Sequence, residues 1–249
     1  MTFMPNDVAS VAVIRLPVPR TAPRIVAAIR WSIPVVSITA PNIIADRISQ
    51  TVESMPDMPP RDAAWALLCD WTQSEPLRKH GRAVEGAVGW YAQNKFGVSG
   101  PELETWRAAG LLHDFDYERF PETHPLEGAE ELRRRGYSDE LVQAVLGHGD
   151  HTGVPRTTPL ARTVYACDEM SGFVIAVALV RPNRSLDEVD PRAVAKKMKD
   201  KGFARTVNRD DITGGAEVLG VDLDKHIAFV IEALKPVAGD LGIGGTEGG

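Results

Sequence analysis

Histidines are concentrated in one part of this 249-residue chain, where five of the six fall between residues 80 and 151. His113 is followed directly by Asp114, and the apolar residues Leu111 and Leu112 precede the pair. Burying a polar pair costs free energy unless a partner satisfies it, so we expect a hydrogen-bond network, a proton-transfer site or a metal ion. Neutral imidazole is the commonest metal ligand, and the clustering favours the metal. The clustered histidines are His80, His113, His124, His148 and His151.

Two carboxylates, Asp114 and Asp168, would give this cluster a mixed set of nitrogen and oxygen donors. Such a set suits manganese, iron, cobalt, nickel or zinc better than calcium, which prefers oxygen alone. Adjacent residues of a helix point about 100 degrees apart. His113 and Asp114 can therefore reach one cation only at the end of a helix or between helices. His226 stands alone in an amphipathic stretch, and we interpret it as a satisfied core or surface residue rather than a ligand.

The elements that must position these residues are helical. From about residue 60 onward, apolar residues recur at spacings of three and four, and glycine or proline marks the ends of the segments. We expect an all-α helical bundle, in which side chains from several helices converge on one core site. The expected helices cover residues 62–74, 75–95, 101–115, 125–135, 138–148, 159–180, 190–200, 208–218 and 222–238.

The sequence predicts three segments. Residues 1–58 are rich in proline and in short runs of β-branched residues. At MPDMPPRDAAWALL the sequence changes to a pattern typical of helices. We expect residues 1–58 to be an N-terminal extension, disordered or outside the native domain, and residues 59–238 to be the catalytic domain. Residues 239–249 contain GIGGTEGG, a composition typical of a flexible tail.

Composition and charge exclude several classes of protein. The formal charge of -6 disfavours non-specific binding to nucleic acid or to a membrane surface. No stretch approaches the roughly 20 apolar residues of a membrane-spanning helix, and the N-terminus lacks the features of an export signal. Cys69 and Cys167 stand far apart and outside any CxxC spacing, so we expect a reduced, cytoplasmic protein without a thiolate zinc site. A homodimer is compatible with the sequence.

Five short segments resemble the HD-domain superfamily of metal-dependent phosphohydrolases, in its HDIG-like, six-ligand binuclear form. The resemblance covers roughly residues 60–238 and implies an all-helical HD domain with a metal site in its core. It implies one divalent transition metal held by His80, His113, Asp114 and Asp168. A second metal would be held by His124 and His148, with Asp114 bridging the two. The segments are KHGRAVE, LLHDFDYE, THPLEGA, LGHGDHTGVP and YACDEMSG.

The chain departs from one well-known branch of that superfamily, the HD-GYP cyclic dinucleotide phosphodiesterases. Tyr117 replaces the lysine that follows their HD motif, and their adjacent histidine pair with its GYP tail appears here as HGDHTGVP. The resemblance therefore implies hydrolysis of a nucleotide or another small phosphate ester, as a phosphomonoesterase or phosphodiesterase, by a metal-activated water. The alternative is an HD-type di-iron oxygenase that cleaves a small hydroxylated or phosphonate substrate, since its ligands follow the same order.

Residues outside the ligand set would complete the chemistry. Besides Asp114, we expect Asp116 or His151 to move protons to the leaving oxygen, or else to orient a ligand. The segment KKMKDKGFARTVNR is basic in an otherwise acidic chain. Two interpretations of this segment remain open. It is either a solvated helix face or a positively charged entrance to the metal site, at which Lys197, Lys201 or Arg205 binds a substrate phosphate.

Overall fold

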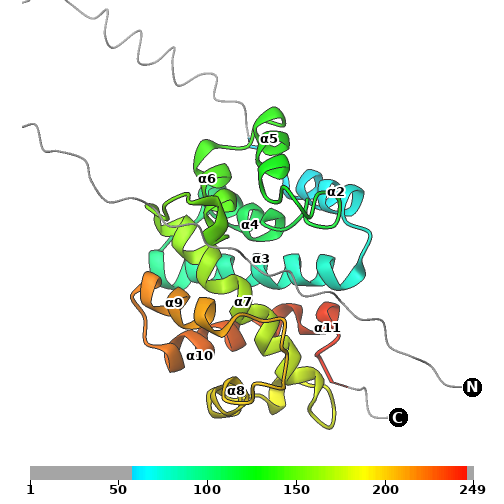
Figure 1. The fold of residues 1–249 in the computed structure, drawn as a ribbon, viewed down its shortest axis with the longest axis vertical. Coiled ribbons are helices and arrows are strands. Elements are labelled where there is room, and N and C mark those ends of the chain that lie inside the picture. The colour runs from blue at the N-terminus through cyan, green and yellow to red at the C-terminus, as the bar shows by residue number, and fades with distance from the viewer. Residues whose placement is uncertain (1–57, 246–249) are drawn as a thin grey trace, which may run out of the picture. The chain divides into compact units, whose positions relative to one another are not determined.

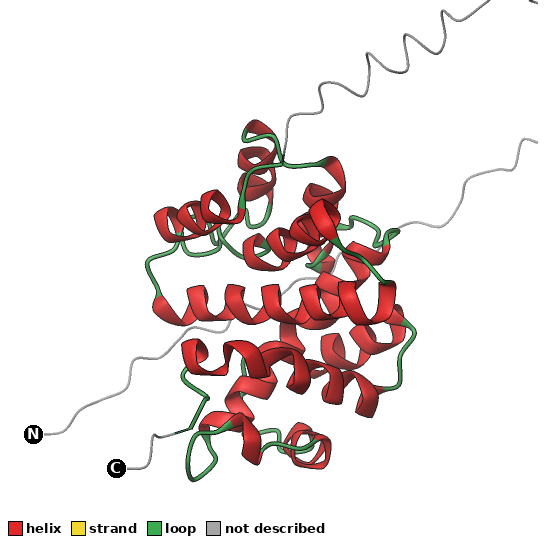
Figure 2. Cartoon of the chain, turned by 180° about the vertical axis from the view of Figure 1, so that it is seen from behind, coloured by secondary structure: helices red, strands yellow, loops and turns green. Residues whose placement is uncertain are grey.

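The computed structural model describes residues 58–245, and within them the chain forms helices and no extended strand (Figure 2). The one strand-like pairing in this range is an isolated antiparallel bridge between Ser185 and Gly244. The prediction of an all-α fold is confirmed. The α-helices are α2 (Arg61–Trp71), α3 (Glu75–Phe96), α4 (Gly100–Leu112), α5 (Leu126–Arg134), α6 (Asp139–Gly147), α7 (Pro159–Leu179), α8 (Pro191–Met198), α9 (Arg209–Leu219), α10 (Leu223–Leu234) and α11 (Ala238–Leu241), with short 3-10 turns η2 (Asp150–Thr152), η3 (Leu186–Glu188) and η4 (Lys235–Val237).

Helix α3 lies in the middle of the bundle (Figure 1). Helix α4 packs along it, and α7 contacts α3, α4, α6 and α9. Helices α2, α5 and α6 lie on the α4 side of α3, whereas α8, α9, α10 and α11 lie on the other side (Figure 1). The two long helices α3 and α7 therefore connect the two halves of the described bundle.

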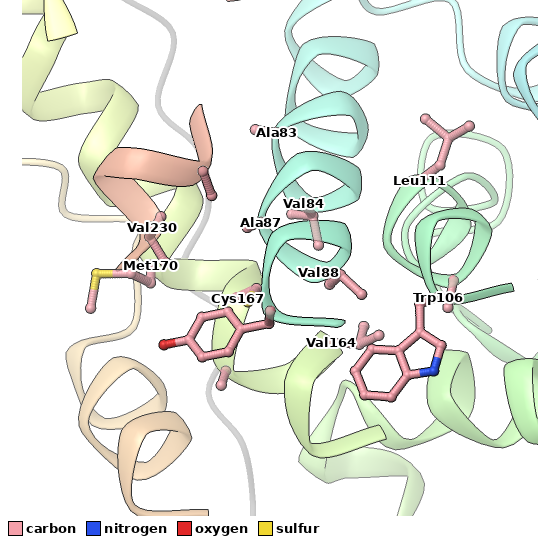
Figure 3. Packing of buried hydrophobic residues seen from close by; sticks show 14 of the residues in the cluster. Ala83, Val84, Ala87, Val88, Trp106, Leu111, Val164, Cys167, Met170 and Val230 are labelled. Carbon is pink, nitrogen blue, oxygen red and sulfur yellow. The ribbon is translucent and has the colours of Figure 1, made fainter. Parts of the chain in front are cut away.

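The core is built from apolar faces of these helices (Figure 3). Ala83, Val84, Ala87 and Val88 recur along α3 at the spacing of one helical face, and each is fully buried. They pack with apolar residues of α4, α7 and α10, and burial of this surface is the main favourable term in folding. The partners visible in Figure 3 include Trp106 and Leu111 from α4, Val164, Cys167 and Met170 from α7, and Val230 from α10.

Two glycines let α3 and α4 approach closely. A Cβ atom on Gly81 would lie 2.8 Å from the backbone oxygen of Leu111, and one on Gly110 would lie 2.8 Å from that of Val84. Only glycine leaves room for backbone at this distance. The close approach matters for the site, since His80 and His113 are the chain neighbours of Gly81 and Leu112.

The observed helix bounds agree with the expected ones to within a few residues, with two informative differences. The helix expected over 101–115 ends at Leu112, so His113 is its C-cap and Asp114 lies just beyond it. The helix expected over 222–238 ends at Leu234 because Pro236 has no backbone N–H to continue the α-helical ladder.

The two predicted segment boundaries lie differently with respect to the described range, which runs from residue 58 to residue 245. The expected extension over 1–58 lies outside the described residues except for Met58, as do residues 246–249 of the expected tail. Packed structure continues past residue 238, because Leu241 and Ile243 are buried and the Leu186 N–H donates to the Ile243 carbonyl at 2.8 Å. Within the described range, no helix combines the length and apolarity needed to cross a bilayer.

Candidate metal centre

The first group of candidate ligands comes from three helices. His80 lies on α3, Asp168 lies on α7, and His113 with Asp114 follows the last turn of α4. The His80 Nε2 atom is 3.1 Å from His113 Nε2 and 2.9 Å from Asp168 Oδ1. One ligand atom from each of these four residues lies within 4.8 Å of the others. Helices α3 and α7 and the end of α4 thus bring together residues that are up to 88 positions apart.

The second group consists of Asp114, His124 and His148. His124 precedes α5 and His148 is the C-cap of α6, and their Nε2 atoms lie 3.1 Å apart. Asp114 Oδ1 is 3.1 Å from His124 Nε2 and 3.2 Å from His148 Nε2. Its other oxygen, Oδ2, is 3.4 Å from His113 Nε2 in the first group. Asp114 therefore faces both groups, with one oxygen toward each.

Hydrogen bonds on the outer edge of the imidazoles set their protonation. His113 Nδ1–H donates to the Gly110 carbonyl at 2.8 Å, and His148 Nδ1–H donates to the Val145 carbonyl at 2.5 Å. His124 Nδ1–H donates to Asp116 Oδ1 at 2.6 Å. In a neutral ring the second nitrogen then carries a lone pair, so the Nε2 atoms of His124 and His148 face each other with lone pairs. That arrangement is repulsive unless a proton or a cation lies between them, and it fits a divalent metal.

Electrostatics of the site also favour a cation. Burial lowers the pKa of His124, but the hydrogen bonds that its ring donates to the carboxylates of Asp114 and Asp116 outweigh burial and raise the pKa to about 9. Burial also opposes charge on His113, yet Asp114 and Asp168 hold its pKa well above the usual value. Burial would raise the pKa of Asp114, but His113 and the other imidazoles hold it well below the usual range. The carboxylates thus stabilise positive charge at the position that a metal ion would take.

Asp116 does not face the ligand atoms. Its side chain is fully buried, Oδ1 accepts from His124 Nδ1, and Oδ2 accepts the Gly128 N–H at 2.7 Å. A Cβ on Gly128 would lie 2.8 Å from the Asp116 carboxylate. The absence of a side chain at Gly128 therefore leaves room for the hydrogen bond from its N–H to Asp116 Oδ2. These are the contacts expected of a group that orients His124, which is one of the two roles that the sequence left open for Asp116.

A pocket of about 290 Å³ opens beside the two groups. His148 and Asp168 line it, and so does His151, whose Nε2–H donates to the backbone oxygen of His124 at 2.8 Å. The side chain of His151 is exposed at this opening. The structure therefore brings His151 next to the candidate ligands but not among them.

Four other residues that the sequence did not single out line the same pocket. Burial and the neighbouring Asp168 carboxylate raise the pKa of Glu169 to about 7. Asp211 is held by the Asn208 amide at 2.7 Å and faces the Tyr165 hydroxyl at 3.3 Å. No sequence signal distinguishes these residues, because Asn208 and Asp211 read as an ordinary helix start and Glu169 as a helix residue. They are Tyr165, Glu169, Asn208 and Asp211.

The basic residues proposed for phosphate binding divide between two places. Lys201 and Arg205 line a pocket of about 500 Å³, and Asn208 lines both this pocket and the one beside the ligands. Lys197 is not among the described residues that line either pocket. Its ammonium group lies 4.5 Å from the centre of the Phe203 ring and 3.8 Å from Asp200. Lys201 and Arg205 thus line a pocket that shares one residue with the pocket beside the ligands, and Lys197 lines neither.

Comparison with known proteins adds one finding. The family model described as HD domain matches residues 78–172, a range that includes all eight residues of the expected ligand and proton-transfer sets. No curated protein and no solved structure matches the chain. HD domains bind divalent metals, and the His and Asp groups described above are those that could hold them.

Proposed function

Because residues 78–172 form an HD domain and the chain belongs to the HD-domain superfamily, we propose that it is a metal-dependent phosphohydrolase. In this proposal it hydrolyses a nucleotide or another small phosphate ester with a metal-activated water. Two ions would be held by His80, His113, Asp114, His124, His148 and Asp168. The observation that carries the proposal is Asp114, whose two oxygens face two separate sets of imidazoles.

The phosphate-ester substrate is supported by two basic residues of a second pocket, although the pocket beside the ligands is itself lined by carboxylates. Lys201 and Arg205 line a pocket that adjoins the ligand-side pocket at Asn208. Guanidinium and ammonium groups bind phosphate oxygens through charge-assisted hydrogen bonds. A phosphate group that reached the ligands would thus have positive side chains beside its path.

Under this proposal the bound ions activate the water, and two residues of the pocket transfer protons. Divalent ions, when bound, would lower the pKa of a water and offset negative charge on the phosphoryl oxygens. The phosphorus–oxygen ester bond breaks as water attacks, and the leaving oxygen needs a proton. His151 Nδ1 is free to carry that proton because Nε2–H is held by the His124 carbonyl. Glu169, with its pKa near 7, is the second group in the pocket suited to proton transfer.

The decisive test is Asp114→Ala beside the control Asp139→Ala, which removes an exposed carboxylate from the first turn of α6. Each purified protein would be analysed for metal content and screened with phosphomonoester and phosphodiester substrates. Removing a hydrogen-bond partner of a metal ligand lowers metal affinity or activity roughly 10- to 100-fold. Removing a ligand that both ions share should lower them further. We expect Asp114→Ala to lose metal and activity while helicity stays, and Asp139→Ala to match wild type. Wild-type activity in Asp114→Ala would contradict the metal assignment.

The same purified protein separates hydrolysis from the oxygenase alternative. Phosphate or nitrophenol release that manganese, cobalt or nickel stimulates would support the proposal. Bound iron with substrate-dependent oxygen consumption, and no ester hydrolysis, would replace it with the oxygenase.

A further inference from the structure

A second pocket of about 260 Å³ contains none of the candidate metal ligands. It lies on α3 between the start of α2, the middle of α4 and the segment that follows α10. Three guanidinium groups reach it from three different helices. The residues that define it are Arg61, Arg82, Gly86, Gly89, Trp90 and Arg107.

Each of the three arginines is held in place by its neighbours. Arg61 binds the buried Glu85 carboxylate through Nε at 2.6 Å and Nη2 at 2.8 Å. The Arg82 guanidinium lies 5.6 Å from the centre of the Trp65 ring and bonds Asp240 through Nη2 at 2.5 Å. Arg107 bonds Glu104 through Nη1 at 3.0 Å. Side chains that are already ordered lose less entropy when a ligand binds.

These ion pairs leave hydrogen-bond donors for a ligand. A guanidinium has five N–H donors, and the bonds to described residues use one nitrogen of Arg82 and one of Arg107. Among the charged residues that line the pocket, three are arginines and one is Glu85, which Arg61 already binds. The carboxylates that pair with Arg82 and Arg107, Asp240 and Glu104, are not among the lining residues, so the groups that face the pocket are mainly guanidinium N–H donors.

Two glycines of α3 keep the pocket open. At Gly86 a Cβ would lie 3.5 Å from the Ala233 carbonyl and 3.6 Å from Val237, which is ordinary contact. At Gly89 a Cβ would lie 3.0 Å from Arg107 Cγ, so the absence of a side chain lets the Arg107 stem lie across the helix. A larger side chain at Gly86 would extend into the pocket without breaking the helix.

We propose that this pocket binds a small anion bearing phosphate or carboxylate groups, at a site separate from the metal centre. Planar guanidinium groups match the oxygens of both anions and bind them through paired hydrogen bonds. Three such groups around one pocket suit a ligand with two negative charges.

The test uses the full chain after removal of metals with a chelator, so that the metal centre contributes no metal-dependent anion binding. Isothermal titration calorimetry with inorganic phosphate and with malonate distinguishes the two anion classes. We expect at least one of them to bind, and Arg107→Gln and Gly86→Leu each to weaken that binding at least tenfold. Arg133→Gln is the matched control, because Arg133 and Arg107 both pair with a glutamate three residues earlier on their helix.

Nuclear magnetic resonance gives the location independently of the variants, since Trp90 lines the pocket and its indole N–H gives a separate signal. Its signal should shift on titration of the wild-type protein with the binding anion. The proposal is overturned if neither anion binds, if Trp90 does not respond, or if Arg107→Gln binds as tightly as Arg133→Gln. Should Gly86→Leu fail to fold, as judged by circular dichroism, Arg107→Gln and the Trp90 shift decide alone. None of these measurements depends on catalysis, so they stand apart from the proposed hydrolysis.

Discussion

At the scale of single residues, two aspartates in the HDFD segment have different surroundings although only Phe115 separates them. Asp114 keeps 24% of its side chain exposed and directs both oxygens at imidazole Nε2 atoms. Asp116 is fully buried behind His124 and accepts from its Nδ1. One carboxylate is therefore placed to bind a cation, and the other fixes the nitrogen that a ligand presents.

Asp116→Asn should impair the second group of ligands selectively. The amide cannot accept from both His124 and Gly128, and an amide N–H placed against His124 Nδ1 would move the ring proton to Nε2. We expect the affinity for one metal to fall roughly 10- to 100-fold, with the site at His80, His113 and Asp168 retained. Metal stoichiometry and calorimetric titration would measure this.

Tyr117→Phe is the control for that variant, because Tyr117 contacts the same imidazole through its ring, 5.4 Å from the ring centre of His124. It should bind metal as wild type does. If Asp116→Asn and Tyr117→Phe retain equal metal, the positioning role of Asp116 is wrong.

At the scale of elements, the distance between α3 and α4 controls whether His80 and His113 meet. Gly81 and Gly110 allow the two backbones to touch, and the two Nε2 atoms consequently lie 3.1 Å apart. A pair of helices held even slightly further apart would separate the first group of ligands, although every ligand residue remained in the chain.

Gly110→Ala should therefore lower both stability and metal affinity. The added Cβ would lie 2.8 Å from Val84 O and 2.9 Å from Val84 C, and overpacking of this kind costs about 1–3 kcal/mol. Urea denaturation and metal titration would measure the two effects. Gly86→Ala is the matched control on α3, where the Cβ meets ordinary contacts and alanine favours the helix. Equal stability and metal affinity in the two variants would show that the close approach is not required.

At the scale of the whole described bundle, His226 connects three helices. Its Nε2–H donates to the Ala166 carbonyl on α7 at 2.8 Å, and its Nδ1 accepts from the Tyr91 hydroxyl on α3 at 2.7 Å. The residue itself lies on α10 and is fully buried. The sequence left open whether His226 is a core or a surface residue, and these contacts place it in the core.

His226 should make folding sensitive to acid. Burial lowers its pKa to about 4 in the folded state, against about 6.5 in an unfolded chain. Between these values the unfolded chain binds more protons, so stability is lost as the pH falls from about 6.5 to about 4, by about 3 kcal/mol in total. Urea denaturation at pH 7 and pH 4.5 would measure the loss in wild type and in His226→Gln.

Glutamine at this position does not titrate and can still donate to one partner and accept from the other. The wild type should lose more stability than His226→Gln over the same pH interval. An identical loss in both proteins would assign the acid sensitivity to other groups.

The sequence by itself determined the helices and the types of ligand. Apolar periodicity and terminal Gly, Pro and Ser residues are local properties, so the expected helix bounds lie close to those observed. The largest differences, of three or four residues, are at the C-terminal ends of α2, α4 and α10. The clustering of histidines with Asp114 and Asp168 indicated a metal site, and the ordered motifs indicated the HD domain that the family model matches. These signals needed no knowledge of which helices are neighbours.

Only the tertiary structure decided how those residues are arranged. Contacts between distant segments decide three features of the site. They set the direction of each Asp114 oxygen, the nitrogen at which an imidazole carries its proton, and the burial of Asp116. The same holds for Glu169 and Asp211 in the ligand-side pocket and for the three arginines that meet on α3. The physical reason is that local propensity acts along one helix, whereas each of these features is a relation between side chains on helices that pack together.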